Sequence, residues 1–209
     1  GTNPGTNPGT NPGTNPGTNP GQNPGNKPGT NPGVVVKPNV TGGVATIPSK
    51  EFENIVEKAF ENNGLISIDL GKEQIVRFEL TKDQVSELKA KGISLSLQNA
   101  DVEVMIPSSL IVDGKDFNVA VNRMYNIGNA KSAVYDFTII VNGEEINQFA
   151  TPITLTFDVD VSKVINTDDL KVFYYNEKTG KWELVPGAVY KDGKVEVKTD
   201  HFSIFTVFE

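Results

Sequence analysis

The sequence predicts a β-rich α+β fold, in which antiparallel, sandwich-like sheets carry two short amphipathic helices and follow a disordered Pro/Gly repeat. Short stretches rich in Val, Ile, Thr and aromatic residues recur about every 8 to 12 residues between turn residues, which is typical of β-sandwiches. Two stretches near the start have apolar residues at helical spacing instead. The first 33 residues contain no Val, Leu, Ile, Met or aromatic residue, so they cannot form a core.

The repeat is built on the unit Gly-Thr-Asn-Pro, which is copied eight times with a few changes. Asn-Pro-Gly-Thr places Pro and Gly at the central positions of a type II turn, so we expect transient turns and extended pieces. A spacer in front of a folded domain is the favoured interpretation. Two alternatives stay open: a stalk glycosylated on its regularly spaced threonines, and an ordered repeat that assembles or binds a surface.

The first strands and the first helix follow the repeat. Residues 34–36 predict a strand or strap, and residues 44–47 predict a strand that stops at Pro48. Ser49 is the expected N-cap of a helix with acidic residues in its first turn. The apolar stripe of this helix consists of Phe52, Ile55, Val56, Ala59 and Phe60.

The next stretch predicts two strands and a second helix. Residues 65–70 and 75–80 are apolar enough for strands, and Gly71 marks the turn between them. Thr81 and Gln84 have the spacing of a capping box, in which each side chain bonds the backbone of the other. The second helix therefore begins after Thr81.

Further strands are expected from Gly92, where the second helix ends, to the last residues. Their predicted ranges are 93–97, 102–106, 118–125, 133–141, 153–159, 171–175, 182–185, 188–190, 195–197 and 202–208. Asn142-Gly143 and Asp192-Gly193 are hairpin turn signals. We therefore expect a linker over 1–33 and a globular module over 34–209. Residues 44–112 and 113–209 are candidate subdomains, because helical spacing ends near residue 113.

Charge and composition limit the partners. Residues 1–50 contain three lysines and no acidic residue, so all 26 acidic residues lie in 51–209. A surface of that sign repels phosphate backbones, so nucleic acid is not an expected partner. No run of about 18 apolar residues predicts a membrane span. Cysteine is absent, which excludes disulfides and thiolate metal sites, and no cofactor is predicted.

The single histidine, His201, could take part in self-cleavage of the chain. In Asp200-His201-Phe202-Ser203, the Ser203 hydroxyl could attack the carbonyl of Phe202 while His201 takes the proton. The tripeptide His-Phe-Ser resembles the cleavage site of autoproteolytic domains of the ZU5–UPA and FIIND type. The favoured interpretation is structural: Asp200 and His201 start the closing strand, and Phe202 and nearby phenylalanines fill the core.

Acidic residues offer a weak calcium candidate. Asp158, Asp160, Asp168 and Asp169 are close in sequence and could supply oxygen ligands. The alternation Asp-Val-Asp-Val instead favours a solvated strand face that carries Asp158 and Asp160. Nothing in the sequence selects a pair of carboxylates for glycoside hydrolysis.

Aromatic residues offer a ligand-binding candidate. Tyr174, Tyr175, Trp182 and Tyr190 fall on neighbouring predicted strands. If two of them point outward together, they form a platform on which sugar rings stack. If they point inward, they are part of the core. Core packing, or a mixture of inward and outward rings, is favoured.

Residues 50–209 resemble a module of Gram-positive bacterial surface proteins that is found beside S-layer homology repeats or carbohydrate-active domains. The resemblance rests on residues 68–71, 134–138, 171–176, 180–185 and 199–203. It implies an extracellular, non-catalytic structural or interaction module on a Pro-rich tether. The expected partners are flanking domains of the parent polypeptide and cell-wall or plant polysaccharide. The alternatives are a carbohydrate-binding module and an autoproteolytic domain.

The chain begins inside the repeat and without an initiator Met, so we interpret it as a piece of a longer polypeptide.

Overall fold

The computed structural model describes residues 33–209. The predicted linker over 1–33 therefore lies outside the described residues, apart from Gly33. The described part is mostly β, with two α-helices, as the sequence predicts.

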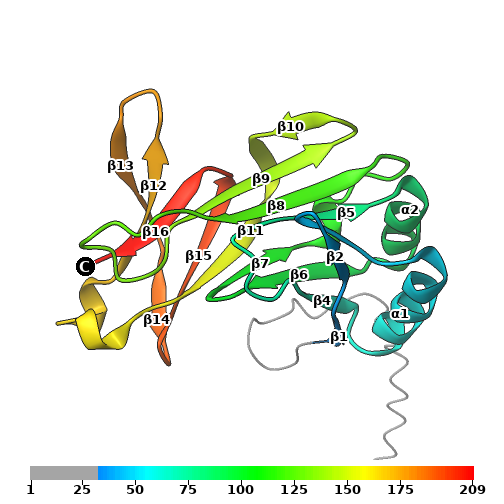
Figure 1. Cartoon of the computed structure of the whole chain (residues 1–209), viewed down its shortest axis with the longest axis horizontal. Helices are drawn as coiled ribbons and strands as arrows, with labels where there is room; N and C mark the ends of the chain where they lie inside the picture. The colour runs from blue at the N-terminus through cyan, green and yellow to red at the C-terminus, as the bar shows by residue number, and fades with distance from the viewer. Residues whose placement is uncertain (1–32) are drawn as a thin grey trace, which may run out of the picture.

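Two sheets form the body of the molecule (Figure 1). The seven-stranded sheet has the order β1 (Val34–Val36), β4 (Leu65–Asp69), β6 (Ser94–Asn99), β7 (Val102–Ile106), β11 (Gln148–Asp158), β15 (Lys194–His201), β14 (Val189–Lys191). The nine-stranded sheet has the order β13 (Lys181–Val185), β12 (Lys171–Asn176), β16 (Ile204–Phe208), β9 (Tyr135–Val141), β8 (Phe117–Arg123), β5 (Ile75–Leu80), β3 (Val44–Thr46), β2 (Asn39–Thr41), with β10 (Glu144–Ile146) paired to β9.

Most strand pairs are antiparallel, and the parallel exceptions lie near the helices. β1 pairs in parallel with β4, β4 with β6, and β3 with β5. A parallel pair needs a long crossover connection. The chain between β4 and β6 provides one, because it passes through β5 in the other sheet and then through α2 (Lys82–Lys91).

The hydrophobic core is continuous and draws on both halves of the chain. Its largest fully buried side chains include Phe52 and Phe78 from the first half and Tyr135, Phe157 and Phe205 from the second. Strand pairing also joins the two halves. β5 pairs with β8 in one sheet, and β7 pairs with β11 in the other.

Two helices pack together at the end of the molecule opposite β12 and β13 (Figure 1). α1 (Ser49–Glu61) is capped by Pro48, whose carbonyl accepts the N–H groups of Glu51 and Phe52, so the predicted N-cap at Ser49 is wrong by one residue. The reason is that the fixed φ of proline already holds the entry to the helix. Among residues 33–209, neither helix has the length and apolar character needed to cross a bilayer.

The capping box of α2 is present as predicted. Thr81 Oγ1 accepts from Gln84 N, and Gln84 Oε1 accepts from Thr81 N at 3.0 Å. The helix ends at Gly92, which has the left-handed φ of 65° that terminates helices at low cost.

Both predicted hairpin turns are confirmed. Asn142 and Gly143 have positive φ values of 52° and 83°, and they join β9 to β10. Asp192 and Gly193, at 50° and 82°, join β14 to β15. Two positive φ values in succession give the turn a twist that matches that of the flanking strands.

The turn predicted at Gly71 is present, with a φ of 74°, and it leads from β4 in one sheet to β5 in the other. Two sequence-based interpretations are corrected. Asp200 and His201 end β15 instead of starting the closing strand, and the chain then passes to β16 in the other sheet. Residues 39–41 form β2, a strand that the sequence did not indicate because Pro38 and the following glycines read as a break.

Candidate functional site

The hairpin of β12 and β13 stands out from the end of the nine-stranded sheet (Figure 1). Side chains alternate between the two faces of a strand. Val172 and its cross-strand neighbour Val185 are buried against the core, which defines the inner face. Phe173 and Tyr175 therefore lie on the outer face.

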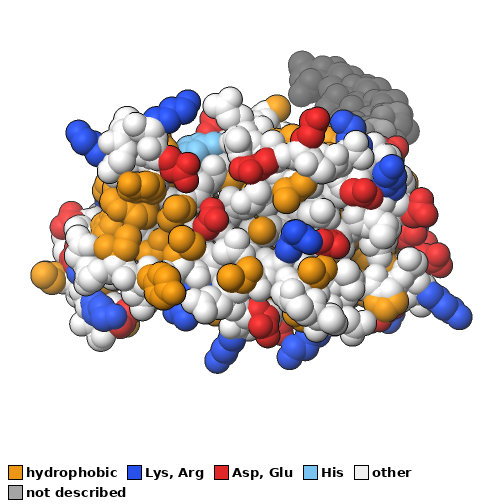
Figure 2. Space-filling model, turned by 45° about the horizontal axis from the view of Figure 1, so that its top comes forward, with side chains coloured by type: hydrophobic (Ala, Val, Ile, Leu, Met, Phe, Trp, Pro, Cys, Tyr) orange, Lys and Arg blue, Asp and Glu red, His pale blue; other side chains and the backbone are white. Residues whose placement is uncertain are grey.

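Four rings gather on this outer face. Tyr175 lies directly opposite Trp182, and their ring centroids are 5.4 Å apart. Phe208, on the neighbouring β16, lies 5.5 Å from Trp182 and 5.5 Å from Phe173. We call Phe173, Tyr175, Trp182 and Phe208 the outer aromatic face, and each of them is partly exposed. Figure 2 shows hydrophobic side chains gathered at the end of the molecule that carries β12 to β16.

Two of the four predicted aromatic candidates lie elsewhere. Tyr174 lies on the inner face of the hairpin, where its ring packs edge-on against His201 at 4.5 Å. Tyr190 lies on β14, at the edge of the other sheet, and packs partly against the core. Although β14 follows β13 in the sequence, the two strands belong to different sheets. Tyr190 is therefore not part of the outer aromatic face.

A polar network holds the inner face of the hairpin. Glu183 accepts from the Tyr174 hydroxyl at 2.5 Å, from Asn176 Nδ2 at 2.8 Å and from Thr179 Oγ1 at 3.1 Å. The hydrogen bond from Tyr174 is the main cause that lowers the pKa of Glu183, and the same bond raises the pKa of Tyr174. One ionised carboxylate thus ties both strands and the turn together.

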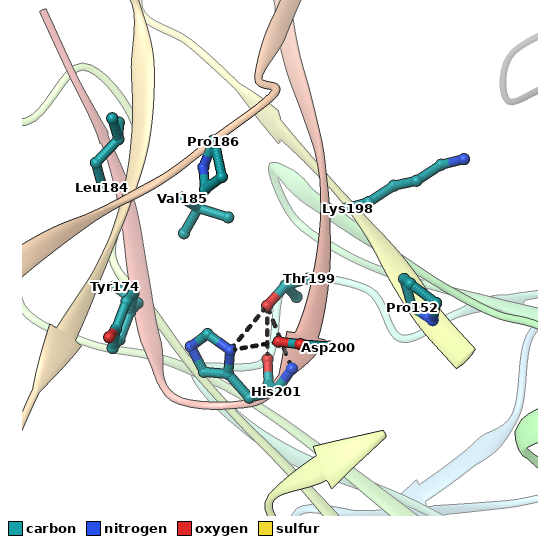
Figure 3. A pocket seen from close by; sticks show the side chains of 9 residues that line it. All are labelled: Pro152, Tyr174, Leu184, Val185, Pro186, Lys198, Thr199, Asp200 and His201. Atoms are coloured by element: carbon teal, nitrogen blue, oxygen red, sulfur yellow. Dashed lines mark hydrogen bonds and ion pairs between the residues drawn. The ribbon is translucent and has the colours of Figure 1, made fainter. Parts of the chain in front are cut away.

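A cleft of about 350 Å³ opens beside Tyr174 (Figure 3). Leu184, Val185 and Pro186 line one side, and Thr199, Asp200 and His201 line the other, while the side chain of Lys198 points away from it. The cleft lies where the ladder between β11 and β15 is interrupted by a register shift between Gln148 and Ile153. Such interruptions open space at the side of a sheet.

The residues of the predicted cleavage site do not form a nucleophile–base pair. His201 Nδ1 donates to Asp200 Oδ1 at 3.0 Å, and this bond lowers the pKa of Asp200. Ser203 Oγ donates to the carbonyl oxygen of Tyr175 at 2.9 Å. Within the described part of the chain, His201 and Ser203 share no hydrogen bond, and neither Phe202 nor Ser203 has a positive φ.

Phe202 itself is part of the core, where it packs against Phe137 at 5.5 Å and Phe149 at 5.1 Å. The His-Phe-Ser sequence therefore turns the chain from one sheet to the other around a buried ring.

The four predicted calcium candidates are not brought together. Asp158 pairs with Lys194 at 2.5 Å, and Asp160 pairs with Lys163 at 2.9 Å. Asp160 caps the short helix η2 (Val161–Lys163), so it lies outside the solvated strand face that the sequence predicts for it together with Asp158. Over residues 33–209, no group of three or more acidic or histidine side chains is arranged to hold a metal ion.

Asp168 and Asp169, the other two candidates, lie in the short helix η3 (Thr167–Asp169). Asn166 Oδ1 accepts a hydrogen bond from the backbone N–H of Asp168, and Asn166 Nδ2 donates one to Asp169 Oδ2.

Sequence reasoning missed Phe173 and Phe208 as members of the outer aromatic face. Phe173 lies two residues before Tyr175 on β12, and side chains two residues apart on a strand share a face. The sequence alone could therefore have placed Phe173 beside Tyr175. Phe208 could not be found in this way, because its position beside Trp182 depends on the pairing of β16 with β12.

Comparison with known proteins identifies two relatives, and no family model matches the chain. A protein of Evansella cellulosilytica named "Putative membrane protein" is 33% identical over 157 residues, which cover 71% of this chain and 24% of that protein. An amylopullulanase of Thermoanaerobacterium thermosulfurigenes is 25% identical over 150 residues, which cover 69% of this chain and 8% of the enzyme. The chain thus spans about a quarter of one relative and less than a tenth of the other.

Proposed function

We propose that residues 34–209 form a non-catalytic structural or interaction module of a secreted bacterial cell-surface protein, with the leading repeat as its tether. One observation carries the proposal: about 70% of this chain resembles a small part of each of two much longer proteins with different names. That is how a portable module behaves. The role of the tether would be geometric, because its length sets the reach and the effective concentration of what it connects.

Fusion of the whole chain to a secreted reporter enzyme tests this proposal. The reporter should keep its turnover, while the fraction retained on the bacterial envelope or on polysaccharide should rise. The chain alone should release no reducing ends from starch or pullulan. Release of reducing ends that disappears in Glu183→Gln or Asp200→Asn would contradict a non-catalytic role.

A second candidate function is polysaccharide binding, and the outer aromatic face favours it. Sugar rings stack on exposed aromatic side chains because their C–H faces are apolar while their hydroxyls stay in water. Tyr175 and Trp182 are adjacent, outward and partly exposed. The amylopullulanase relative supports a polysaccharide context.

Affinity electrophoresis with soluble polysaccharides and sedimentation with insoluble ones test this second function. Trp182→Ala should strongly weaken any binding that is found, while the circular dichroism spectrum is kept. Tyr190→Ala, which removes a predicted candidate on the other sheet, serves as the matched control and should bind normally.

A further inference from the structure

The rings of the outer aromatic face are not coplanar. The ring planes of Tyr175 and Trp182 differ by 60°, those of Trp182 and Phe208 by 81°, and those of Phe173 and Phe208 by 68°. A flat crystalline polysaccharide needs rings that share one plane, because its surface chains are parallel and straight. Rings at steep angles to one another instead match successive sugar units that turn relative to each other.

The orientation of the rings is fixed by contacts on both faces of the hairpin. Trp182 contacts both Tyr175 and Phe208 on the outer face, with ring centroids 5.4 and 5.5 Å away. On the inner face, Glu183 accepts three hydrogen bonds that join β12, β13 and the turn. A site that is ordered before binding loses little conformational entropy when it binds. The steep ring angles are therefore a property of the site and are not expected to flatten on contact.

Charge selects the kind of chain. The four rings carry no formal charge, and the whole protein carries −7 at neutral pH. Glu183, which follows Trp182 in the sequence, is turned to the inner face with its partners. An anionic wall polymer would be repelled by the overall charge. Lys171, which lies opposite Phe208 on the same face, already donates to the carbonyl oxygen of Asp168. A neutral chain is not repelled in this way.

We propose, on the basis of the polysaccharide-binding function above, that the outer aromatic face binds one bent chain of a neutral, soluble glucan. Trp182 is the central stacking ring, and Tyr175 and Phe208 meet neighbouring sugar units at an angle to it. Flat crystalline polysaccharide and polyanionic polymers are excluded by the ring angles and by charge, respectively.

Affinity electrophoresis and titration calorimetry of the full chain test this inference. The three probes are soluble amylose, microcrystalline cellulose and polygalacturonate. Amylose should bind, and Trp182→Ala should weaken that binding at least about tenfold, the loss typical of a central interface residue. Tyr175→Ala should give a smaller loss, and Tyr190→Ala should give none. Unchanged thermal unfolding of each variant separates lost binding from lost fold.

Three other outcomes would overturn the inference. Binding of cellulose or polygalacturonate, but not of amylose, with loss in Trp182→Ala would overturn the inference and leave polysaccharide binding intact. Binding of none of the three would overturn the inference and the second candidate function together. A concentration-dependent increase in mass that Trp182→Ala abolishes would show that the outer aromatic face joins two copies of the chain, and this also overturns the inference.

Discussion

Ser203 Oγ donates a hydrogen bond to the backbone carbonyl oxygen of Tyr175 across 2.9 Å. This bond ties the start of β16 to the neighbouring strand β12, at the point where the chain passes between the sheets. It also directs the only hydroxyl proton of Ser203 away from His201, whose Nδ1 is engaged with Asp200. The serine is thereby arranged to join strands and is not poised as a nucleophile.

We therefore expect the peptide bond between Phe202 and Ser203 to stay intact. Intact-mass spectrometry of the purified chain, incubated and then mildly denatured, should show the full-length mass alone. Ser203→Ala should lower the free energy of unfolding by about 1 kcal/mol, because one partly buried hydrogen bond is lost. A seven-residue fragment beginning at Ser203 would contradict this structural role.

Glu209 should contribute to stability in a pH-dependent manner. Its carboxylate accepts from Ile165 N at 2.8 Å, also contacts Asn166 N, and pairs with Lys131 Nζ at 2.9 Å. The bond from Lys131 and the two backbone N–H groups lower its pKa from 4.5 to about 2. Because the folded pKa is lowered, the stabilisation is complete above pH 4.5 and is lost as the pH falls toward 2.

Thermal unfolding of the wild type and Glu209→Gln checks this expectation. The difference in Tm should be largest near neutral pH and should shrink between pH 4.5 and 2. Asp192→Asn, at an exposed hairpin turn, serves as the control for loss of one charge. A difference that does not change with pH would disprove the ionic origin.

Tyr135 should titrate only when the protein unfolds. Its ring is fully buried, and its hydroxyl donates to Asp101 and to the carbonyl of Asn99 at 3.1 Å. Burial, followed by the contact with Asp101, raises its pKa well above the ordinary value of 10. Tyr135→Phe should therefore leave the ultraviolet phenolate titration of the folded protein unchanged.

The same variant should destabilise the protein by about 1 to 2 kcal/mol, because Asp101 and the Asn99 carbonyl lose a buried donor. Denaturant unfolding measures this cost. Tyr125→Phe, at a ring that is 88% exposed, should have almost no effect. An equal effect of both substitutions would show that the buried hydrogen bonds do not matter.

Gln84 should matter more than an ordinary helix residue. Its side chain is buried, completes the capping box with Thr81 and donates to the carbonyl of Ile47 at 2.8 Å. Gln84→Ala should cost about 2 kcal/mol in unfolding free energy, because it removes the reciprocal cap and leaves a buried carbonyl unpaired. Thr81→Ala removes only a cap and should cost about 1 kcal/mol. Equal costs would mean that the bond to Ile47 adds nothing.

We propose that residues 34–209 fold as one cooperative unit and not as separate subdomains 44–112 and 113–209. In a fragment that ends at residue 112, β5 lacks β8 and β7 lacks β11. Each strand would then present an unpaired edge beside an open core. Residues 34–112 alone should show no sigmoidal unfolding transition and poor dispersion of amide resonances. A cooperative transition in that fragment would establish two subdomains.

Local features of the fold were predictable because their signals lie within a few residues of each other. The capping box of Thr81 and Gln84 and the turns at Asn142-Gly143 and Asp192-Gly193 are of this kind. The cap of α1 was placed one residue late, since a serine beside a proline offers two ways to start a helix.

Sheet membership was not predictable in the same way. Whether β4 pairs with β5 or with β6 is decided by long-range packing. A glycine turn between two strands does not show whether they pair with each other. The candidate site shows the same limit. Tyr175 and Trp182 were predictable because they lie on predicted strands that follow each other in the sequence, whereas Phe208 joins them only through the pairing of β16 with β12. Tyr190 was misplaced because its strand, close in sequence, belongs to the other sheet.

The position of β16 between β12 and β9 has a consequence for synthesis of the protein. A chain made from its first residue onward cannot close the nine-stranded sheet until residues 204–208 have left the ribosome. Until then, the core that Phe205 and Val207 complete stays open, and the polypeptide remains loosely folded. The last step of folding is therefore tied to the release of the final strand, and a shortened chain that lacks residues 204–208 should stay incompletely folded.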